Sequence, residues 1–474
     1  MATDSRGKYL FKNTFIFTIG SLATKLITFI LVPLYTHMMT TQEYGSVDLI
    51  TTIGMIMAPV LILNIGESVM RFSLDKNADH NQIMSTGLLA LIFALLVGCL
   101  IIPVTRFFSS ISEFSSYIYL YTISSAASQL FLCYLRGKEK LLLYTYGNII
   151  NTLSVALLNI LFLVVLKSGI EGYLKAYILA NFITAAYAFA VGKVPEVIKN
   201  FSINKNLMVA MLKYSVVLVP NVFMWWIMNS ADRIIITAVM GAAANGIFAI
   251  SYKIPSLMST VAGIFNQAWA YSAIRENESE DKESYTNNVY SAFFMVISLS
   301  ALGMMMILKP FLKIYVNEAF YSAWEYSPYL IIGFVFQTLG TFLSTPYTVN
   351  KDSRGFLFSA VFGAVVNIVL NCLLVFKLGL AGVAAATGIS YLAVFLYRVI
   401  DTKKYIRMDV FNKKYIIIFG LMVVQAAVMY LENAMGQFLL VVLFLIGVAL
   451  QYKTWKPIVL QLLEKVMGQT KRIK

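Results

Sequence analysis

Charged residues inside long apolar stretches are the first candidates for chemistry in this sequence. Lys25 lies in the middle of one such stretch, Lys253 lies in another, and Asp232 and Arg233 stand side by side in a third. A charged side chain in hydrocarbon is costly, so those that remain usually line a water-filled space or pair with one another. A lysine offers a phosphate a compact positive charge and three donors. Lys25 and Lys253 therefore suggest a site for a diphosphate group, contributed from two halves of the chain.

Neighbouring charges offer structural alternatives to binding. Glu67 and Arg71 stand four residues apart, a spacing that favours an ion pair on the surface of a helix. Asp232 and Arg233 fit either a functional site or a structural pair that braces neighbouring helices. Asp48 begins another apolar stretch. The residues alone are consistent with either a structural or a functional role for these charges.

Asparagine and aromatic side chains form polar stripes along several apolar stretches. Asn148 and Asn151 fall within one narrow arc of a helix, and Asn221 and Trp225 fall on nearly one face of another. An asparagine in a membrane span more often makes an interhelical hydrogen bond than binds a ligand. Amides and aromatic rings nevertheless suit the hydroxyl-rich rings of sugars. The candidates for lining a sugar-binding cavity are Asn148, Asn151, Asn221, Trp225 and Tyr252.

No catalytic or metal-binding set can be assembled from the sequence. Its two histidines, His37 and His80, both lie near predicted loops, and the three cysteines, Cys99, Cys133 and Cys372, fall inside apolar stretches without paired spacing. General acid–base chemistry and zinc sites need closely placed groups of these types. We therefore expect no enzyme activity, no catalytic residue, no metal and no cofactor.

The composition requires membrane helices to position these residues. Of the 474 residues, 59% are hydrophobic and 13% are charged, and the mean hydropathy is +0.76. An ordinary soluble domain is about 45 to 50% apolar and about 25% charged. A helix needs roughly 20 apolar residues to cross the hydrocarbon, and the apolar runs of this chain predict fourteen spans. We therefore expect an all-α polytopic membrane protein.

The positions of lysine and arginine predict the orientation in the membrane. Most of the 37 Lys and Arg residues fall in alternate connecting segments, including residues 193–213 and 398–414. Cytoplasmic loops carry an excess of these residues, so both termini are predicted to be cytoplasmic. The net charge of +14 then reflects membrane orientation, and no nucleic acid partner is needed to explain it.

Two short motifs recur in the two halves of the chain. The pattern K-x-G-[IL]-x-G-x3-A begins at Lys167 and again at Lys377. It predicts a tight outer turn whose small residues let two helices approach closely. A second pair of dipeptides, at 44–45 and 245–246, follows the first and the seventh predicted span. Such internal repeats are typical of two-lobed transporters that bind substrate between the lobes.

These patterns predict two pseudo-symmetric six-helix lobes around a central cavity, followed by two further helices. The N-terminal lobe comprises residues 1–192, and a basic cytoplasmic linker spans residues 193–213. The second lobe comprises residues 214–400, and residues 401–474 form a C-terminal appendage with two spans and a cytoplasmic tail.

Several stretches in both halves of the chain combine into a family pattern. They are Gly20-Ser21 with Lys25, Pro33 to Thr36, Thr41 to Gly45, Leu212 to Pro220, Asp232 to Ile236, Gly246 to Lys253, and Asn266 to Trp269. The pattern resembles the polysaccharide transporters, the Wzx-type flippases of lipid-linked oligosaccharides in the multidrug, oligosaccharidyl-lipid and polysaccharide (MOP) superfamily. The resemblance covers most of the chain, and the Asp-Arg run is its most specific part.

The resemblance implies a cationic central cavity and transport by alternating access. Proteins of this type turn undecaprenyl-diphosphate-linked sugars, such as O-antigen or capsule repeat units, from the inner to the outer leaflet of the bacterial cytoplasmic membrane. Lys25 and Lys253 occupy spans that present cations to the diphosphate in related flippases, and Arg233 is a further cationic candidate. The candidates for coupling to protons or sodium are Asp48, Asp232 and Glu67.

The implied partners are the polyprenyl-diphosphate-linked oligosaccharide, membrane lipids, and polymerases and glycosyltransferases of the same pathway. Two other functions compete with the flippase. A cation-coupled multidrug or small-molecule antiporter of the same superfamily usually has twelve spans and an acidic cavity, which the predicted spans and Lys25 argue against. An integral-membrane enzyme of polysaccharide assembly needs a large extramembrane loop or a catalytic acid, base or histidine, and every predicted outer loop is short.

Overall fold

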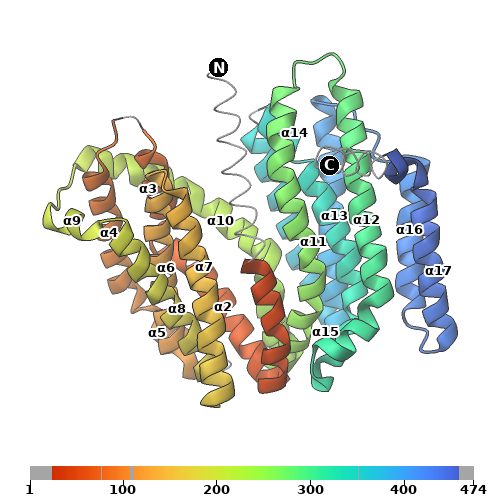
Figure 1. Cartoon of the computed structure of the whole chain (residues 1–474), viewed down its shortest axis with the longest axis horizontal. Helices are drawn as coiled ribbons and strands as arrows, with labels where there is room; N and C mark the ends of the chain where they lie inside the picture. Colours follow the sequence, from red (N-terminus) through yellow and green to blue (C-terminus); the bar gives the residue numbers. More distant parts are fainter. Residues whose placement is uncertain (1–23, 76, 107–111, 351, 458–474) are drawn as a thin grey trace, which may run out of the picture. The chain divides into compact units, whose positions relative to one another are not determined.

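The computed structural model describes residues 24–457 of the chain, apart from residues 76, 107–111 and 351. Within this part every regular element is a helix (Figure 1). Nine of the described helices are long and apolar enough to cross a membrane. The predicted all-α polytopic fold is therefore confirmed, whereas the number of fourteen spans stays a prediction.

Contacts divide the chain into two compact units, Met1–Ala249 and Ile250–Lys474. The first unit contains a helix over residues 24–38, α2 (Thr41–Leu61), α3 (Ile65–Ser73), α4 (His80–Gly98), α5 (Ile101–Arg106), η1 (Ser112–Phe114), α6 (Ser115–Gly137), α7 (Leu141–Asn159), η2 (Ile160–Val165), α8 (Gly169–Val191), α9 (Val194–Lys199), α10 (Lys205–Met240) and the start of α11 (Ala242–Arg275). The basic segment 193–213, the predicted linker between lobes, lies within the first unit, where α10 packs against α2, α3 and α4. The lobe boundaries themselves stay a prediction.

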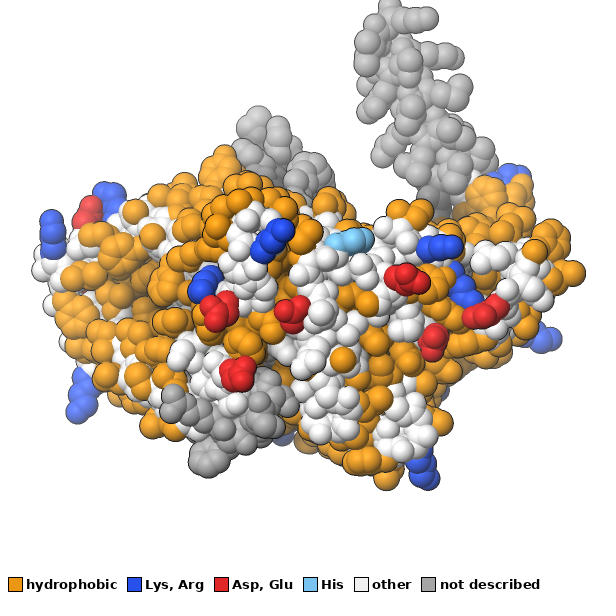
Figure 2. Space-filling model, turned by 90° about the horizontal axis from the view of Figure 1, so that it is seen from below, with side chains coloured by type: hydrophobic (Ala, Val, Ile, Leu, Met, Phe, Trp, Pro, Cys, Tyr) orange, Lys and Arg blue, Asp and Glu red, His pale blue; other side chains and the backbone are white. Residues whose placement is uncertain are grey.

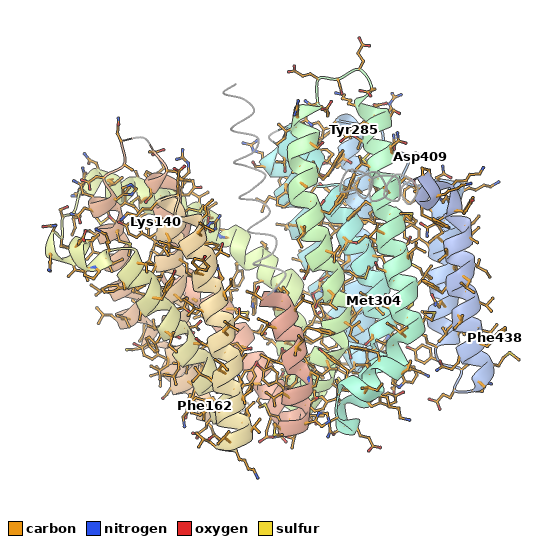
Figure 3. All side chains as sticks on the ribbon, in the orientation of Figure 1. Lys140, Phe162, Tyr285, Met304, Asp409 and Phe438 are labelled. Atoms are coloured by element: carbon orange, nitrogen blue, oxygen red, sulfur yellow. The ribbon has the colours of Figure 1, made fainter. Side chains whose placement is uncertain are left out.

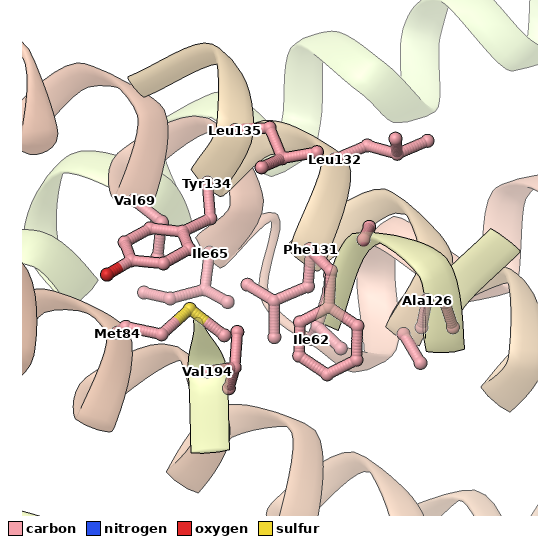
Figure 4. Packing of buried hydrophobic residues seen from close by; sticks show 14 of the residues in the cluster. Ile62, Ile65, Val69, Met84, Ala126, Phe131, Leu132, Tyr134, Leu135 and Val194 are labelled. Atoms are coloured by element: carbon pink, nitrogen blue, oxygen red, sulfur yellow. The ribbon is translucent and has the colours of Figure 1, made fainter. Parts of the chain in front are cut away.

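An apolar cluster forms the core of the first unit where α3, α4, α6 and α9 meet (Figure 4). Ile65, Val69, Met84 and Val194 are completely buried in it, and Phe131 is 7% exposed. Close packing gives each of these side chains many weak attractive contacts at once. The cluster therefore holds four helices of the unit in fixed positions relative to one another.

The second unit contains the rest of α11 and the helices that follow it. They are α12 (Lys282–Tyr315), η3 (Glu318–Glu325), α13 (Ser327–Phe342), α14 (Thr345–Val349), α15 (Ser353–Asp401), η4 (Thr402–Lys404), α16 (Lys413–Val428) and α17 (Ala434–Leu450). The largest contact in this unit joins α13 to α15, and α12 packs against α13, α16 and α17.

Buried polar side chains attach the C-terminal helices to the second unit. Gln425 of α16 donates its Nε2 to the carbonyl oxygens of Leu302, at 3.1 Å, and Leu440, at 3.2 Å. Ser298 of α12 donates its hydroxyl to Gln451 Oε1 at 3.2 Å. Interhelical hydrogen bonds of this kind hold membrane helices together. α16 and α17 are therefore an integral layer of this unit.

Both copies of the repeated turn motif fold in the same way. Gly169 has a φ of +52° and Gly379 has a φ of +56°, a left-handed conformation that favours glycine. Gly379 also divides α15 into two helices. A Cβ added at Gly382 would lie 2.4 Å from the carbonyl oxygen of Leu374, and one added at Gly172 would also meet the turn before it. The predicted tight turns with close helix approach are therefore confirmed in both halves.

Labelled side chains show the two ends of each unit. In Figure 3, Lys140 and Phe162 lie at opposite ends of the first unit, and Tyr285 and Asp409 lie at the end of the second unit away from Phe438. This alternation agrees with the orientation predicted from the positive charges, which places Lys140, Tyr285 and Asp409 on the cytoplasmic side. The face seen in Figure 2 carries Lys, Arg, Asp and Glu side chains interspersed among hydrophobic ones, without a large block of one charge.

Candidate functional site

An ion pair joins two helices of the first unit. Asp48 lies on α2 and Arg233 on α10, and the Arg233 Nε atom lies 2.7 Å from Asp48 Oδ2. The side chains of Arg233 and Asp48 are only 12% and 14% exposed. Low exposure strengthens the attraction between the charges, but removing each charge from water is costly. Each charge is therefore tolerated there because its partner is present.

The helix ends fix the positions of both charged residues. Thr40 caps α2, because its Oγ1 accepts the Glu43 backbone N–H at 3.2 Å while Glu43 Oε2 accepts the Thr40 N–H at 2.8 Å. This reciprocal arrangement is a capping box. α10 ends at Gly241, whose φ of +90° is a conformation that suits glycine. Asp48 and Arg233 each lie about two turns from these helix ends.

A second carboxylate and several tyrosines accompany the ion pair. Asp232 is completely buried next to Arg233 in the chain. The ring of Tyr173 stacks on Tyr177 at 4.7 Å, and the ring of Tyr35 contacts Tyr173 edge-on at 5.0 Å. Tyr177 lies close enough to Asp48 for their charges to interact. Ionisable groups gathered inside a membrane protein commonly mark a path for protons or ions.

The backbones of α2 and α11 approach each other closely at two glycines. A Cβ added at Gly45 would lie 1.8 Å from the carbonyl oxygen of Ala242, and one added at Gly246 would lie 2.0 Å from that of Thr41. Asn245 donates its Nδ2 to the Gly45 carbonyl at 2.8 Å. The repeat pattern had paired these two dipeptides across the halves of the chain. Equivalent positions therefore contact each other, as residues do across a twofold axis.

Lys25 presents its side chain at the surface of an apolar helix. It lies in the helix over residues 24–38 and is exposed. Its neighbours Leu26 and Ile30 are 48% and 68% exposed. Thr28, one turn away, donates its hydroxyl to the Thr24 carbonyl at 2.9 Å, so that hydroxyl is already used within the helix. An exposed ammonium in such surroundings requires an anion or water.

Lys253 and Tyr252 lie on α11 within the second unit. Tyr252 and Tyr391 place their hydroxyl oxygens 3.1 Å apart, and the Tyr252 ring contacts Phe334 edge-on at 4.9 Å. Tyr252 is thereby fixed against α13 and α15. Lys253 is half-buried beside it. The joint action of Lys25 and Lys253 on a diphosphate stays a prediction.

The asparagine stripe of α7 is hydrogen-bonded within the first unit. Asn151 donates its Nδ2 to Asn181 Oδ1 at 3.1 Å, and Asn181 in turn donates to Ser124 Oγ at 3.5 Å. Asn148 donates to the Tyr144 carbonyl of its own helix at 3.1 Å. The alternative role that we gave for asparagines, an interhelical hydrogen bond, is thus what Asn151 shows.

Two other predicted cavity residues lie beyond what the structure describes. The side chains of Asn221 and Trp225 on α10 fall outside the described residues, so their role stays a prediction. Trp226, the next residue on the same helix, donates its indole N–H to the Thr52 carbonyl at 3.2 Å. This bond is a further link between α10 and α2.

The ion pair predicted between Glu67 and Arg71 is wrong. Arg71 Nη1 lies 2.7 Å from Asp75 Oδ1, and both side chains are more than half exposed. Glu67 lies in the first turn of α3, where the helix dipole favours a carboxylate without a basic partner. A role for Glu67 in ion coupling stays a prediction.

Sequence reasoning missed a buried cation in the second unit. We had counted Arg398 with the cytoplasmic loop charges, but it is 8% exposed within α15. Its Nη1 donates to the Gly340 carbonyl at 2.7 Å and its Nε donates to Ser359 Oγ at 3.0 Å. Gly340 lies in the last turn of α13, where carbonyls have no partner within the helix. The apolar residues on both sides of Arg398 were the signal that could have identified it.

The class of protein follows from these features. Two helical units, helices long enough to cross a membrane and polar pairs buried between helices define an all-α polytopic membrane protein. The chain belongs to the family described as Polysaccharide biosynthesis protein, whose model matches residues 10–277, more than half of the chain.

One curated relative and two solved structures illustrate the likeness. A protein named Probable lipid II flippase MurJ, from Thermotoga maritima, is 24% identical over 160 residues, and the match spans 32% of this chain and only 34% of that relative. A structure of lipid II flippase MurJ in an inward closed conformation has a TM-score of 0.63 at 12% identity, covering 96% of this chain and 100% of the other. An inward-facing multidrug resistance MATE family transporter of the MOP superfamily has a TM-score of 0.56 at 14% identity, covering 88% and 100%. At these identities the structures show a shared fold.

Proposed function

We propose that this protein is a flippase that moves undecaprenyl-diphosphate-linked oligosaccharide repeat units, of O-antigen or capsule type, across the bacterial cytoplasmic membrane by alternating access. Membership of a polysaccharide biosynthesis family supports a glycan substrate. The fold shared with a lipid II flippase supports a lipid-linked one. The observation that carries the proposal is Lys25, an exposed ammonium beside exposed apolar side chains on the helix over residues 24–38, because a charge at membrane depth needs an anion or water.

The cationic candidates differ in how available their charge is. The charge of Arg233 is compensated by Asp48 at 2.7 Å, so its contribution to an anion site is weakened. In this proposal Lys25 and Lys253 bind the diphosphate of the substrate as point charges. The sugar side of the substrate is assigned to Tyr252, with Asn221 and Trp225 as further candidates. The amides of Asn148 and Asn151 already donate hydrogen bonds, Asn148 within its own helix and Asn151 to Asn181, so they are less available to a sugar.

The acidic residues of the first unit supply the energy coupling in this proposal. Asp48 pairs with Arg233, and Asp232, the residue before Arg233 in the chain, is completely buried. Protonation of Asp48, or binding of a cation to it, would release Arg233 from the pair. Glu67 is the third candidate. Polymerases and glycosyltransferases that supply or consume the repeat unit are the expected protein partners.

A cation-coupled antiporter for multidrug or other small molecules is the second candidate. The shared fold with a multidrug resistance MATE family transporter favours it, as does the buried carboxylate of Asp232. Lys25 disfavours it, since an exposed ammonium repels a cationic drug.

Deletion of the gene is the experiment that separates the functions. The location of the lipid-linked oligosaccharide would be measured with a leaflet-specific probe in spheroplasts. The flippase proposal expects this lipid to build up in the cytoplasmic leaflet while surface polysaccharide is lost. A lipid-linked unit that still reaches the outer leaflet, or that is chemically altered, would contradict the proposal and favour the antiporter or an enzyme.

Substitution of Lys25 tests the diphosphate site itself. Lys25→Ala is expected to abolish export without preventing membrane insertion, whereas Lys25→Arg retains part of the export because the charge remains. Lys313→Ala is the matched control, because Lys313 is also exposed but lies at the end of α12. Full export by Lys25→Ala would exclude a diphosphate role for this residue.

A further inference from the structure

An open pocket lies at one end of the second unit, where α11, α12 and α14 meet residues 405–408. Its walls include the aromatic side chains of Trp269, Tyr285, Phe342 and Tyr405, and Glu276 and Lys282 contribute one charge of each sign. Figure 3 labels Tyr285 at this end of the unit, which the charge distribution predicts to be cytoplasmic. Pockets that hold small molecules are commonly largely apolar, with a few polar groups.

Hydrogen bonds hold the walls of the pocket in place. Tyr405 donates its hydroxyl to Asp352 Oδ2 at 2.7 Å, and the Gly355 backbone N–H donates to Asp352 Oδ1 at 2.9 Å. These two hydrogen bonds lower the pKa of Asp352 to about 2, and the bond from the Gly355 backbone has the larger effect. The hydroxyls of Tyr285 and Ser272 lie 3.0 Å apart and join α12 to α11. A site whose walls are already fixed loses less freedom when a ligand binds.

Trp269, whose side chain lines the pocket, has a buried donor without a partner among the described residues. It is 5% exposed, and its ring stacks on Phe342 with centroids 5.1 Å apart. Its indole N–H is buried and has no hydrogen-bond partner among the described residues. Buried polar groups in native structures nearly always have a partner, and each exception needs an explanation. An acceptor atom supplied by a ligand is the explanation that a pocket at this position offers.

The polar groups of the pocket select among ligand chemistries. The Trp269 N–H requires an acceptor, whereas the Glu276 carboxylate requires a donor. A sugar hydroxyl is both donor and acceptor, and a sugar ring also offers an apolar face to aromatic side chains. A fully ionised phosphate is attracted by Lys282, which also lines the pocket, but has no donor for Glu276, and an acyl chain satisfies neither Trp269 nor Glu276. The Asn277 and Asn350 side chains at the pocket add amides, which also suit hydroxyl groups.

We propose that this pocket binds a sugar ring and that it recognises the glycan on the cytoplasmic side before translocation. The identity of the glycan as part of a lipid-linked substrate rests on the proposed flippase function. The binding of a sugar ring rests on the pocket alone. A free sugar and the glycan of a lipid share this chemistry, and the two are separated by experiment.

The test uses the full-length protein in lipid nanodiscs, with free glucose, galactose and N-acetylglucosamine as probes. Saturation-transfer difference NMR measures sugar binding. Trp269→Phe keeps an aromatic ring but removes the N–H, and Glu276→Gln removes the charged acceptor. At least one sugar is expected to bind the wild type, and its affinity is expected to fall about tenfold in each variant, as for loss of one good hydrogen bond. Trp324→Phe is the matched control, because Trp324 lies in η3 outside the pocket.

The outcomes distinguish this proposal from the flippase function. Absence of sugar binding by the wild type, or unchanged binding by folded Trp269→Phe and Glu276→Gln, overturns the pocket proposal. Displacement of the sugar by undecaprenyl phosphate, which carries no glycan, also overturns it, because the pocket would then bind the lipid headgroup. A wild-type protein that binds sugar through these residues but translocates no lipid-linked oligosaccharide in proteoliposomes would leave the sugar site standing and refute the flippase.

Discussion

Removing either partner of the Asp48–Arg233 pair is expected to destabilise the first unit more than removing both. The two side chains are 14% and 12% exposed and are joined at 2.7 Å. Asp48→Leu leaves the Arg233 guanidinium buried without a counter-charge. Arg233→Met leaves the Asp48 carboxylate buried without a counter-charge. Such single changes cost about 3 to 5 kcal/mol, whereas replacing a buried pair by apolar residues is often neutral. For a unit of this size that cost lowers the melting temperature by roughly 6 to 20 °C.

The double-mutant cycle is measured by thermal unfolding of the purified protein in detergent. The double variant Asp48→Leu with Arg233→Met is expected to melt above either single variant. The exposed pair of Lys175 and Glu171, at 2.8 Å and about half exposed, is the matched control. Its single variants should change stability by no more than about 1 kcal/mol. Melting shifts of the two single variants that simply add in the double variant would refute the coupling between Asp48 and Arg233.

Three further changes test other contacts. Gly45→Ala puts a Cβ 1.8 Å from a carbonyl of α11 and is expected to lower both melting temperature and export, whereas Gly263→Ala, with no atom within 4 Å, should be tolerated; equal behaviour of the two would show that the close approach is unimportant. Arg398→Met leaves the Gly340 carbonyl unpaired and is expected to cost about 1 to 3 kcal/mol, so an unchanged melting curve would contradict its role as a helix cap. The pKa of Asp352 is about 2 in the folded protein against a usual 3.8, so the stabilisation that its carboxylate provides is complete above about pH 4 and is lost as the pH falls through 2. The melting temperatures of the wild type and of Asp352→Asn should therefore converge over that pH range. A difference in melting temperature that stays constant with pH would contradict this role of Asp352.

The sequence was sufficient for the features that depend on local pattern. Apolar runs predicted the helices, and the repeated motif predicted turns at Gly169 and Gly379. Such turns can be recognised in the sequence because a left-handed backbone conformation favours glycine. The dipeptides at 44–45 and 245–246 were identified as equivalent. Their contact through Gly45 and Gly246 was not predicted, since sequence similarity between two positions does not say that they touch.

Partners of charged residues were harder to predict, because spacing alone seldom selects one. Arg71 has a carboxylate four residues away on each side, and the structure pairs it with Asp75. Arg233 and Asp48 are far apart in the chain and meet only because α10 packs against α2. Arg398 was assigned to a loop because a cation near a basic segment normally marks one. Each of these depends on tertiary packing.

Polar residues of this protein divide into two groups with different consequences for function. Asn151, Asn181 and Gln425 donate hydrogen bonds across helices inside one unit, so their amides contribute to cohesion of that unit. A transporter that works by rocking one lobe against the other needs lobes that do not deform. The exposed ammonium of Lys25 has no such structural use in the described residues. Binding of the substrate's diphosphate is therefore expected to depend on the exposed cation, and substitution of the amides is expected to reduce stability before it reduces transport.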